Sequence, residues 1–157
     1  MHLPALSRTH LAPGTAGLPL HALLYEAHRV FDEQLATVVD AVDAGVDKVS
    51  LVETWTAFDH ALRAHLQVEE AWLLPGLEAT HGEAIAALRE EHEAIRLWLE
   101  ELDVAVQLHA ARAEQLLAFL ECLRAHARDE DAGAYRWADG DLDSRAQAAL
   151  RRALREG

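Results

Sequence analysis

The residues that point to chemistry in this chain are histidines and glutamates spaced as if on the inner faces of helices. Two pairs have the form His-x-x-x-Glu, which places both side chains on one helix face. Polar groups on a buried face are costly unless something satisfies them. A pair of bound metal ions would satisfy all of them together. The candidate ligands are His28, His65, Glu69, His92, His126 and Glu130.

The spacing alone is weak as a signal. Three of the ten histidines have an acidic residue four positions later, at Asp32, Glu69 and Glu130, and the chain has 27 acidic residues in 157. Chance alone predicts about 1.7 such pairs. The prediction therefore depends on where the helices place these residues.

Apolar residues recur at three- and four-residue steps in four segments, which predicts four amphipathic helices. The first follows Pro19 and stops near Gly45, and the second starts near Leu51 and includes Trp72 on its inner face. We expect this second helix to end before Pro75-Gly76. The third covers about 85–106, and the fourth starts near Leu116 and continues toward 137. Short connections between long helices predict an all-α, antiparallel up-down four-helix bundle.

The candidate ligands fill gaps in these apolar stripes, and they also share one height. Residues equidistant from a turn lie at the same level in an antiparallel helix pair. His28 and His65 are centred on 45–47, Glu69 and His92 on 80–81, and His92 and His126 on 109. Each centre falls in a predicted connection, so the six side chains should converge on one layer.

The predicted domains are an irregular lead-in at 1–18, the bundle at 19–139 and a C-terminal helix or tail at 140–157. Asp143-Ser144 is a plausible cap for a short helix in that tail. The other six histidines, in the lead-in, off the stripes or in connections, are expected at the surface: His2, His10, His21, His60, His81 and His109. Cys122 is expected to be a small buried thiol.

Composition limits the class of protein. The formal net charge is -13, which argues against nucleic acid or an anionic membrane as a partner and favours binding of cations. The single cysteine excludes an intrachain disulfide and fits a reducing compartment. There is no apolar run long enough to span a bilayer and no recognisable secretory signal, so we expect a cytoplasmic protein.

The chain also contains an internal repeat. The segment from His65 through Glu69-Glu70 resembles the one from His126 through Glu130-Asp131, and Glu26-Ala-His28 resembles Glu90-Glu91-His92. Two similar helix hairpins, each with a His and a His-x-x-x-Glu, would put three ligands around each of two adjacent ions. Glu26 and Glu90 precede matched histidines and could accept hydrogen bonds from ring N–H groups, although surface glutamates are the commoner outcome.

With these segments and Leu73-Leu74-Pro75, the chain resembles the hemerythrin-like, or HHE cation-binding, family over about residues 19–139. The resemblance implies an oxo- or hydroxo-bridged di-iron centre with four terminal imidazoles and with Glu69 and Glu130 as bridging carboxylates. Oxygen-carrying hemerythrins have a further histidine where this chain has Arg96. A seventh ligand is then missing, or comes from water or another residue, of which Asp32 is the nearest candidate.

The predicted function is a non-heme di-iron protein that binds or reacts with a small oxidant such as O2, H2O2 or NO, and whether it is an enzyme stays open. Zn or Mn could replace iron, since imidazole and carboxylate ligands suit all three. Alternatives are an iron- or oxygen-responsive regulatory module, a zinc-bound or metal-free interaction bundle, and a metal-free polar layer of His–Glu hydrogen bonds. Tyr25, Phe31 and Trp72 are among the residues expected near the pocket, where Tyr25 could hydrogen-bond a bound oxygen species or be an ordinary core or boundary tyrosine.

Overall fold

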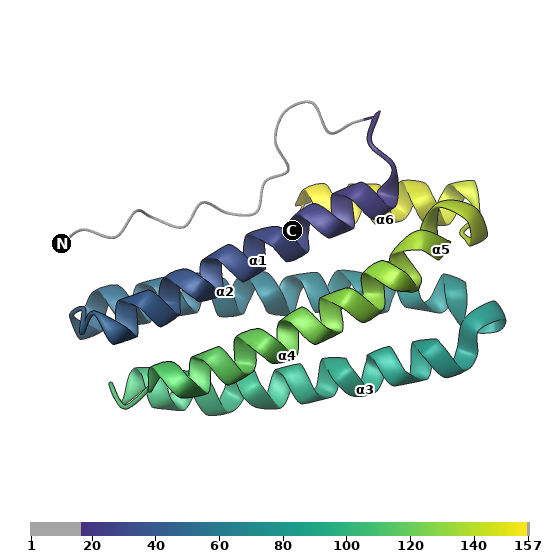
Figure 1. Cartoon of the computed structure of the whole chain (residues 1–157). Coiled ribbons are helices and arrows are strands. Elements are labelled where there is room, and N and C mark those ends of the chain that lie inside the picture. Colours follow the sequence, from purple (N-terminus) through teal and green to yellow (C-terminus); the bar gives the residue numbers. More distant parts are fainter. Residues whose placement is uncertain (1–16, 157) are drawn as a thin grey trace.

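The structure is a computed structural model that describes residues 17–156, and it is built from helices (Figure 1). Most of the lead-in predicted at 1–18 lies outside the described residues, as do His2 and His10. The helices are α1 (Leu20–Asp43), α2 (Lys48–Val68), a π-helical turn η2 (Glu69–Leu73), α3 (Leu74–Gln107), α4 (Ala113–Ala132), α5 (Ala134–Asp141) and α6 (Ser144–Glu156).

Four long helical segments form the antiparallel bundle that the sequence predicts. Helix α1 packs against α2 and α4, and α3 packs against the same two helices. Figure 1 shows the α1–α2 and α3–α4 connections at one end of the bundle and the turn inside α3 at the other. The first connection uses Gly45 with φ 66°, a left-handed conformation that glycine adopts without steric cost. Asp47 then caps α2 by accepting a hydrogen bond from the Ser50 backbone N–H.

The prediction that the second helix ends before Pro75-Gly76 is wrong. Helical backbone continues through the π-helical turn and both residues, and the chain reverses only at His81, whose φ -127° and ψ 32° are non-helical. Pro75 lies at the start of α3, where a missing N–H is tolerated. Its ring would crowd the carbonyl of residue 71 in a regular α-helix, which favours the wider π turn just before it.

The π turn also changes which side chains face the core. An uninterrupted α-helix from His65 and Glu69 would bury Trp72, as expected from the sequence. The turn inserts one extra residue, so that Trp72 is 47% exposed while Leu73 and Leu74 are fully buried. The expectation that Trp72 lines the inner face is therefore wrong, because it assumed a single α-helical register.

The core has two apolar parts, which we call the distal core and the proximal core. The distal core lies toward the α1–α2 and α3–α4 connections and includes Phe31, Phe58 and Phe119. The proximal core lies toward α5 and α6 and includes Leu73 and Leu77. On each long helix the candidate ligands fall between a distal-core and a proximal-core residue. The site is therefore a polar layer between two apolar ones.

Helix α4 is interrupted at Gly133, and α5 continues at a new angle. A Cβ on Gly133 would lie 3.1 Å from the Trp137 ring and 3.2 Å from the Asp129 carbonyl oxygen, so glycine permits this close approach. Asp139 of α5 accepts hydrogen bonds from the Leu20 N–H at 2.8 Å and from the His21 ring at 2.6 Å. These bonds fix α5 against the start of α1.

The short C-terminal helix is present as α6, which contacts η2 and α2. Asp143 caps it by accepting a hydrogen bond from the Ala146 N–H at 2.8 Å, as the sequence suggests. Among the described residues, no helix is both long enough and apolar enough to cross a membrane.

Candidate metal centre

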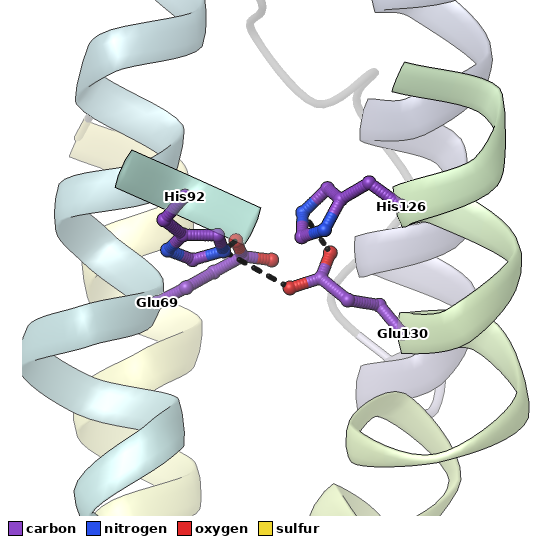
Figure 2. A group of neighbouring side chains, drawn as sticks. All are labelled: Glu69, His92, His126 and Glu130. Carbon is purple, nitrogen blue, oxygen red and sulfur yellow. Dashed lines mark hydrogen bonds and ion pairs between the residues drawn. The ribbon is translucent and has the colours of Figure 1, made fainter. Parts of the chain in front are cut away.

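The six candidate ligands meet in the middle of the bundle, where they form two groups that share Glu69. Glu69, His92, His126 and Glu130 form one group, and His28, His65 and Glu69 form the other. Within each group, one possible ligand atom from each residue lies within 4.8 Å of those from the rest. Figure 2 shows the first group, with His126 and Glu130 reaching in from α4 toward His92 and Glu69.

The helices position these side chains through simple periodicity. His65 and Glu69 lie one turn apart on consecutive helical segments, and His126 and Glu130 lie one turn apart on α4. His28 and His92 come from the middle of α1 and α3. Both glutamate side chains have no exposed surface, and the histidines are buried or nearly so.

The distances between nitrogen and oxygen atoms fit ligands that share an ion. Two atoms that each lie about 2.1 Å from one ion are separated by about 3.0 Å at an octahedral angle and about 3.4 Å at a tetrahedral one. The Nε2 atoms of His28 and His126 lie 3.0 and 3.2 Å from Glu130 Oε2. His92 Nε2 lies 3.3 Å from Glu130 Oε1, and His65 Nε2 lies 3.0 Å from Glu69 Oε1.

Several of these buried atoms have no hydrogen-bond partner. They include Glu69 Oε2, Glu130 Oε2 and His126 Nε2. Glu130 Oε2 is unbonded even though two imidazole nitrogens lie within 3.2 Å of it, because the geometry does not suit donation. Buried polar atoms are normally paired, so a layer with this many unsatisfied atoms is a poor hydrogen-bond network. The same atoms fit a cation well, and the residues present therefore suit a metal centre.

Carboxylates outside the layer lie near the outward ring nitrogen of three imidazoles, and two of them accept a hydrogen bond from it. His92 Nδ1 donates to Glu70 Oε1 at 2.9 Å, and His126 Nδ1 donates to Glu91 Oε2 at 2.7 Å. His28 Nδ1 lies 3.4 Å from Asp131 Oδ1. Such partners fix the ring so that Nε2 faces a metal. Each of these three acids is next to a candidate ligand in the sequence: Glu70 follows Glu69, Glu91 precedes His92 and Asp131 follows Glu130.

Glu26 and Glu90, which the sequence offered for this role, lie at the surface instead, the commoner outcome for such glutamates. Glu26 pairs with the exposed Arg29, and Glu90 is exposed. Residues adjacent to a buried helical position lie about 100° around the helix. They can therefore still reach a histidine on the neighbouring helix. Which acid reaches a histidine depends on how neighbouring helices pack, and the residue that precedes each histidine in the sequence does not reveal it.

Arg96 does not face the layer. Its Nη2 donates to Glu70 Oε2 at 2.6 Å, and its Nη1 donates to Glu93 at 2.7 Å. Arg96, Glu70 and His92 therefore form a chain that ends at a candidate ligand. Asp32 is paired with Arg124 at the surface, with Arg124 Nε 2.5 Å from its Oδ1, and is not placed to supply a seventh ligand.

In the metal-free protein, protons balance the buried carboxylates. Burial lowers the pKa of His28, but the neighbouring carboxylates of Asp131 and Glu130 outweigh this effect and raise it to about 10. Burial likewise lowers the pKa of His126, but the neighbouring Glu130 carboxylate outweighs burial and raises it to about 9. Burial raises the pKa of Glu130, yet three imidazoles hold it well below its usual value. A metal would take the place of these protons.

Tyr135 is the site residue that the sequence did not predict. It is 1% exposed, and its Oη lies 2.7 Å from His28 Nε2 and 3.2 Å from His65 Nε2. The hydroxyl also donates to Glu69 Oε1. Burial and the carboxylates of Glu130 and Glu69 raise the pKa of the phenol, so it stays neutral without a metal. The expectation that Tyr25 lies at the pocket is wrong, because Tyr25 is 58% exposed.

The sequence contains an indirect indication that Tyr135 lies at the site. Tyr135 follows Glu130 by five residues, which is off the α4 stripe in a continuous helix. The break at Gly133 brings it back toward the layer. Gly133 lies two residues before Tyr135 and about one turn after the predicted ligand Glu130, and this was the available indication.

The histidines expected at the surface that are described here lie outside the layer. His60 and His109 are exposed. His21 pairs with Asp139, while His81 pairs with Asp141 at 2.6 Å and stacks on Trp137. Cys122 is half-buried against the distal core, and burial raises its thiol pKa, which fits a packing role.

Comparison with known proteins agrees with this site. No curated protein and no solved structure matches the chain. The sequence model of the family described as the hemerythrin HHE cation-binding domain matches residues 20–138. That range contains the whole bundle, all six candidate ligands and Tyr135. The chain therefore belongs to the hemerythrin HHE cation-binding domain family.

Proposed function

We propose that this protein holds two iron ions at the centre of the bundle and there binds or reacts with a small oxidant such as O2, H2O2 or NO. The terminal ligands are His28, His65, His92 and His126, and Glu69 and Glu130 bridge the two ions. The observation that carries this proposal is the buried layer in which carboxylate oxygens and imidazole nitrogens face each other unbonded at ligand spacing.

The donor set supports iron. Mixed imidazole and carboxylate ligation suits Fe, Mn and Zn and disfavours Mg and Ca. Two adjacent groups that share Glu69 support two ions, since Glu130 also lies between histidines of both groups. Iron would supply redox chemistry and open coordination positions for a small ligand. Zn or Mn in its place would keep the same ligands.

The chain's own residues would shape access to that centre. The distal and proximal cores seal the layer from both ends of the bundle. The His28 side chain is 11% exposed and the other three candidate imidazoles are less so, which leaves little room for anything larger than a small molecule. Phe31 packs against His65 with ring centroids 5.2 Å apart and limits water on that side. The neutral phenol of Tyr135 provides a hydrogen-bond donor inside this dry site.

Two alternatives keep the same bundle. In a regulatory module, iron or oxygen occupancy would control stability or the binding of a protein partner. In an interaction bundle, zinc or no metal would fill the layer. The unbonded buried atoms argue against the metal-free version, because buried polar groups are normally hydrogen-bonded.

An optical spectrum separates these functions. Protein loaded with iron should show charge-transfer absorption from a bridging oxygen to ferric iron, and azide or peroxide should shift it. Zinc-loaded protein, which has no such transition, is the control. Iron-loaded protein whose spectrum is unchanged by azide and by peroxide would contradict a centre open to small ligands.

A further inference from the structure

Tyr135 lies where a ligand atom would lie, and it is one of only two tyrosines in the chain. Its Oη is 2.7 Å from His28 Nε2 and 3.2 Å from His65 Nε2, and it contacts Glu69 Oε1. These three residues form the His28–His65–Glu69 group that could hold an ion. Atoms that share an ion are separated by about 3.0 to 3.4 Å, and Oη lies at this spacing from His65 Nε2. The closer contacts to His28 and Glu69 are hydrogen bonds of the neutral phenol in the metal-free protein, and they place its oxygen against every member of the group.

From this geometry we infer that Tyr135 is the seventh protein ligand and that it binds, as a phenolate, the iron on the His28–His65 side. The inference rests on the proposed di-iron centre. It also explains how a site with arginine at position 96 reaches a seventh ligand, since the ligand comes from α5.

The packing around Tyr135 holds its hydroxyl in the layer. The ring is stacked on His28, with centroids 4.8 Å apart, and the residue belongs to the proximal core. Asp139 ties the following turn of α5 to the start of α1. The hydroxyl therefore cannot turn away from the layer without moving α5. A structural tyrosine that only donates to Glu69 would not need both Nε2 atoms within 3.2 Å.

The binding step is a simple exchange. The Oη–H bond breaks, the proton leaves to solvent, and a lone pair on Oη forms the bond to ferric iron, with no change of oxidation state. A nearby cation reverses the effect of burial on an acidic group, because the charged form is then the favoured one. The two ions become unlike, since the ion on the His92–His126 side has only nitrogen and carboxylate donors.

The test is the visible and resonance Raman spectrum of ferric protein, with Tyr135→Phe as the variant and Tyr25→Phe as the matched control. Wild-type protein and the Tyr25→Phe control should show phenolate-to-iron absorption and phenolate ring modes that shift when ring-deuterated tyrosine is incorporated. Tyr135→Phe should lose both signals, and its affinity for one iron should fall at least about tenfold.

Three other outcomes would overturn the assignment of Tyr135 as a ligand. Two irons per wild-type chain without phenolate modes would overturn the assignment of Tyr135 but leave the di-iron centre intact. No bound iron in wild-type protein would overturn both. Phenolate modes that persist in Tyr135→Phe would also overturn it. If Tyr135→Phe fails to fold, the labelled wild-type spectrum still decides, because Tyr25 is far too exposed to reach the layer.

Discussion

The two halves of the metal layer come from a repeated sequence, but they are not equivalent in the structure. In the His92–His126 half, Glu70 and Glu91 hold both ring N–H groups, and Arg96 braces Glu70. In the His28–His65 half, Tyr135 enters the layer itself and only His28 has a nearby acid, Asp131. The duplication supplies the shared ligands and the matched acids Glu70 and Asp131, and the halves differ through Glu91, Arg96 and Tyr135.

This difference suggests that the two halves of the layer would bind their ions differently. An imidazole whose N–H faces a carboxylate is a stronger donor and is held more firmly. A phenol offers an anionic oxygen that favours the ferric state. Glu69 and Glu130 join the halves, because each lies against histidines of both. Variants that remove a bridge, a terminal ligand or an outer partner should therefore differ in a predictable order.

The largest effect should come from a bridging glutamate. Glu130→Ala removes the carboxylate that lies within 3.3 Å of His28, His92 and His126, so iron content should fall from two per chain to near zero. The increase in Tm on iron loading should vanish with it, a loss of about 2.7 kcal/mol for iron at a hundredfold excess over Kd. Metal analysis and thermal unfolding check this. Glu121→Ala, at an exposed acid on the same helix, should keep both.

A terminal histidine should affect mainly its own half. His65→Ala should lose the ion beside Tyr135, and His126→Ala the ion beside His92, which leaves about one ion per chain in each. Only His65→Ala should also lose the phenolate signal. Metal analysis with the visible spectrum measures both. Wild-type metal content in the two variants would show that these histidines are not ligands.

The outer partners Glu70 and Arg96 should have smaller effects, and these should be confined to the His92 half. Glu70→Gln weakens the acceptor of the His92 N–H, so iron should be released to a chelator about 10 to 100 times faster. Arg96→Gln should act in the same direction but less, since Arg96 works through Glu70. Stopped-flow chelation measures the rates. Arg29→Gln, which removes a glutamate-paired arginine on the surface of α1, is the matched control. Equal release from all three variants would contradict the asymmetry.

The smallest effect is a pH dependence confined to metal-free protein. The folded pKa of His28 is raised from 6.5 to about 10 and that of His126 to about 9. A raised folded pKa means that stability is fully present below pH 6.5 and is lost as pH rises through 9 to 10. Glu130 acts oppositely, and its contribution is lost as pH falls below its usual 4.5. Chemical denaturation at pH 6.5 and 10 measures this.

Iron-loaded protein is the control for that measurement. Metal replaces the protons in the layer, so the loaded form should not lose this stability between pH 6.5 and 10. Metal-free protein that becomes more stable over the same range would contradict the assignment of charge to the layer.

The parts of the site that follow from regular helices could be predicted from the sequence. The apolar stripes predicted the bundle, and equal distances from the turns predicted that the six polar residues meet, as they do. The register after Glu69 could not be predicted, because the π turn adds a residue and moves Trp72 outward. Tyr135 was missed because it enters through the helix break at Gly133.

The outer partners were missed for a different reason. Glu70, Glu91 and Asp131 reach histidines on neighbouring helices, so their role depends on how helices pack rather than on position in one helix. The resemblance to oxygen-carrying hemerythrins indicated that Arg96 stands where those proteins have a histidine. It did not show that Arg96 braces Glu70, which needs the side-chain geometry.

The most direct test of the central claim is the metal content of protein produced with ample iron. A buried layer of four imidazoles and two carboxylates that binds iron as proposed should hold close to two irons per chain. A fully folded bundle with close to no iron under these conditions would contradict the di-iron centre.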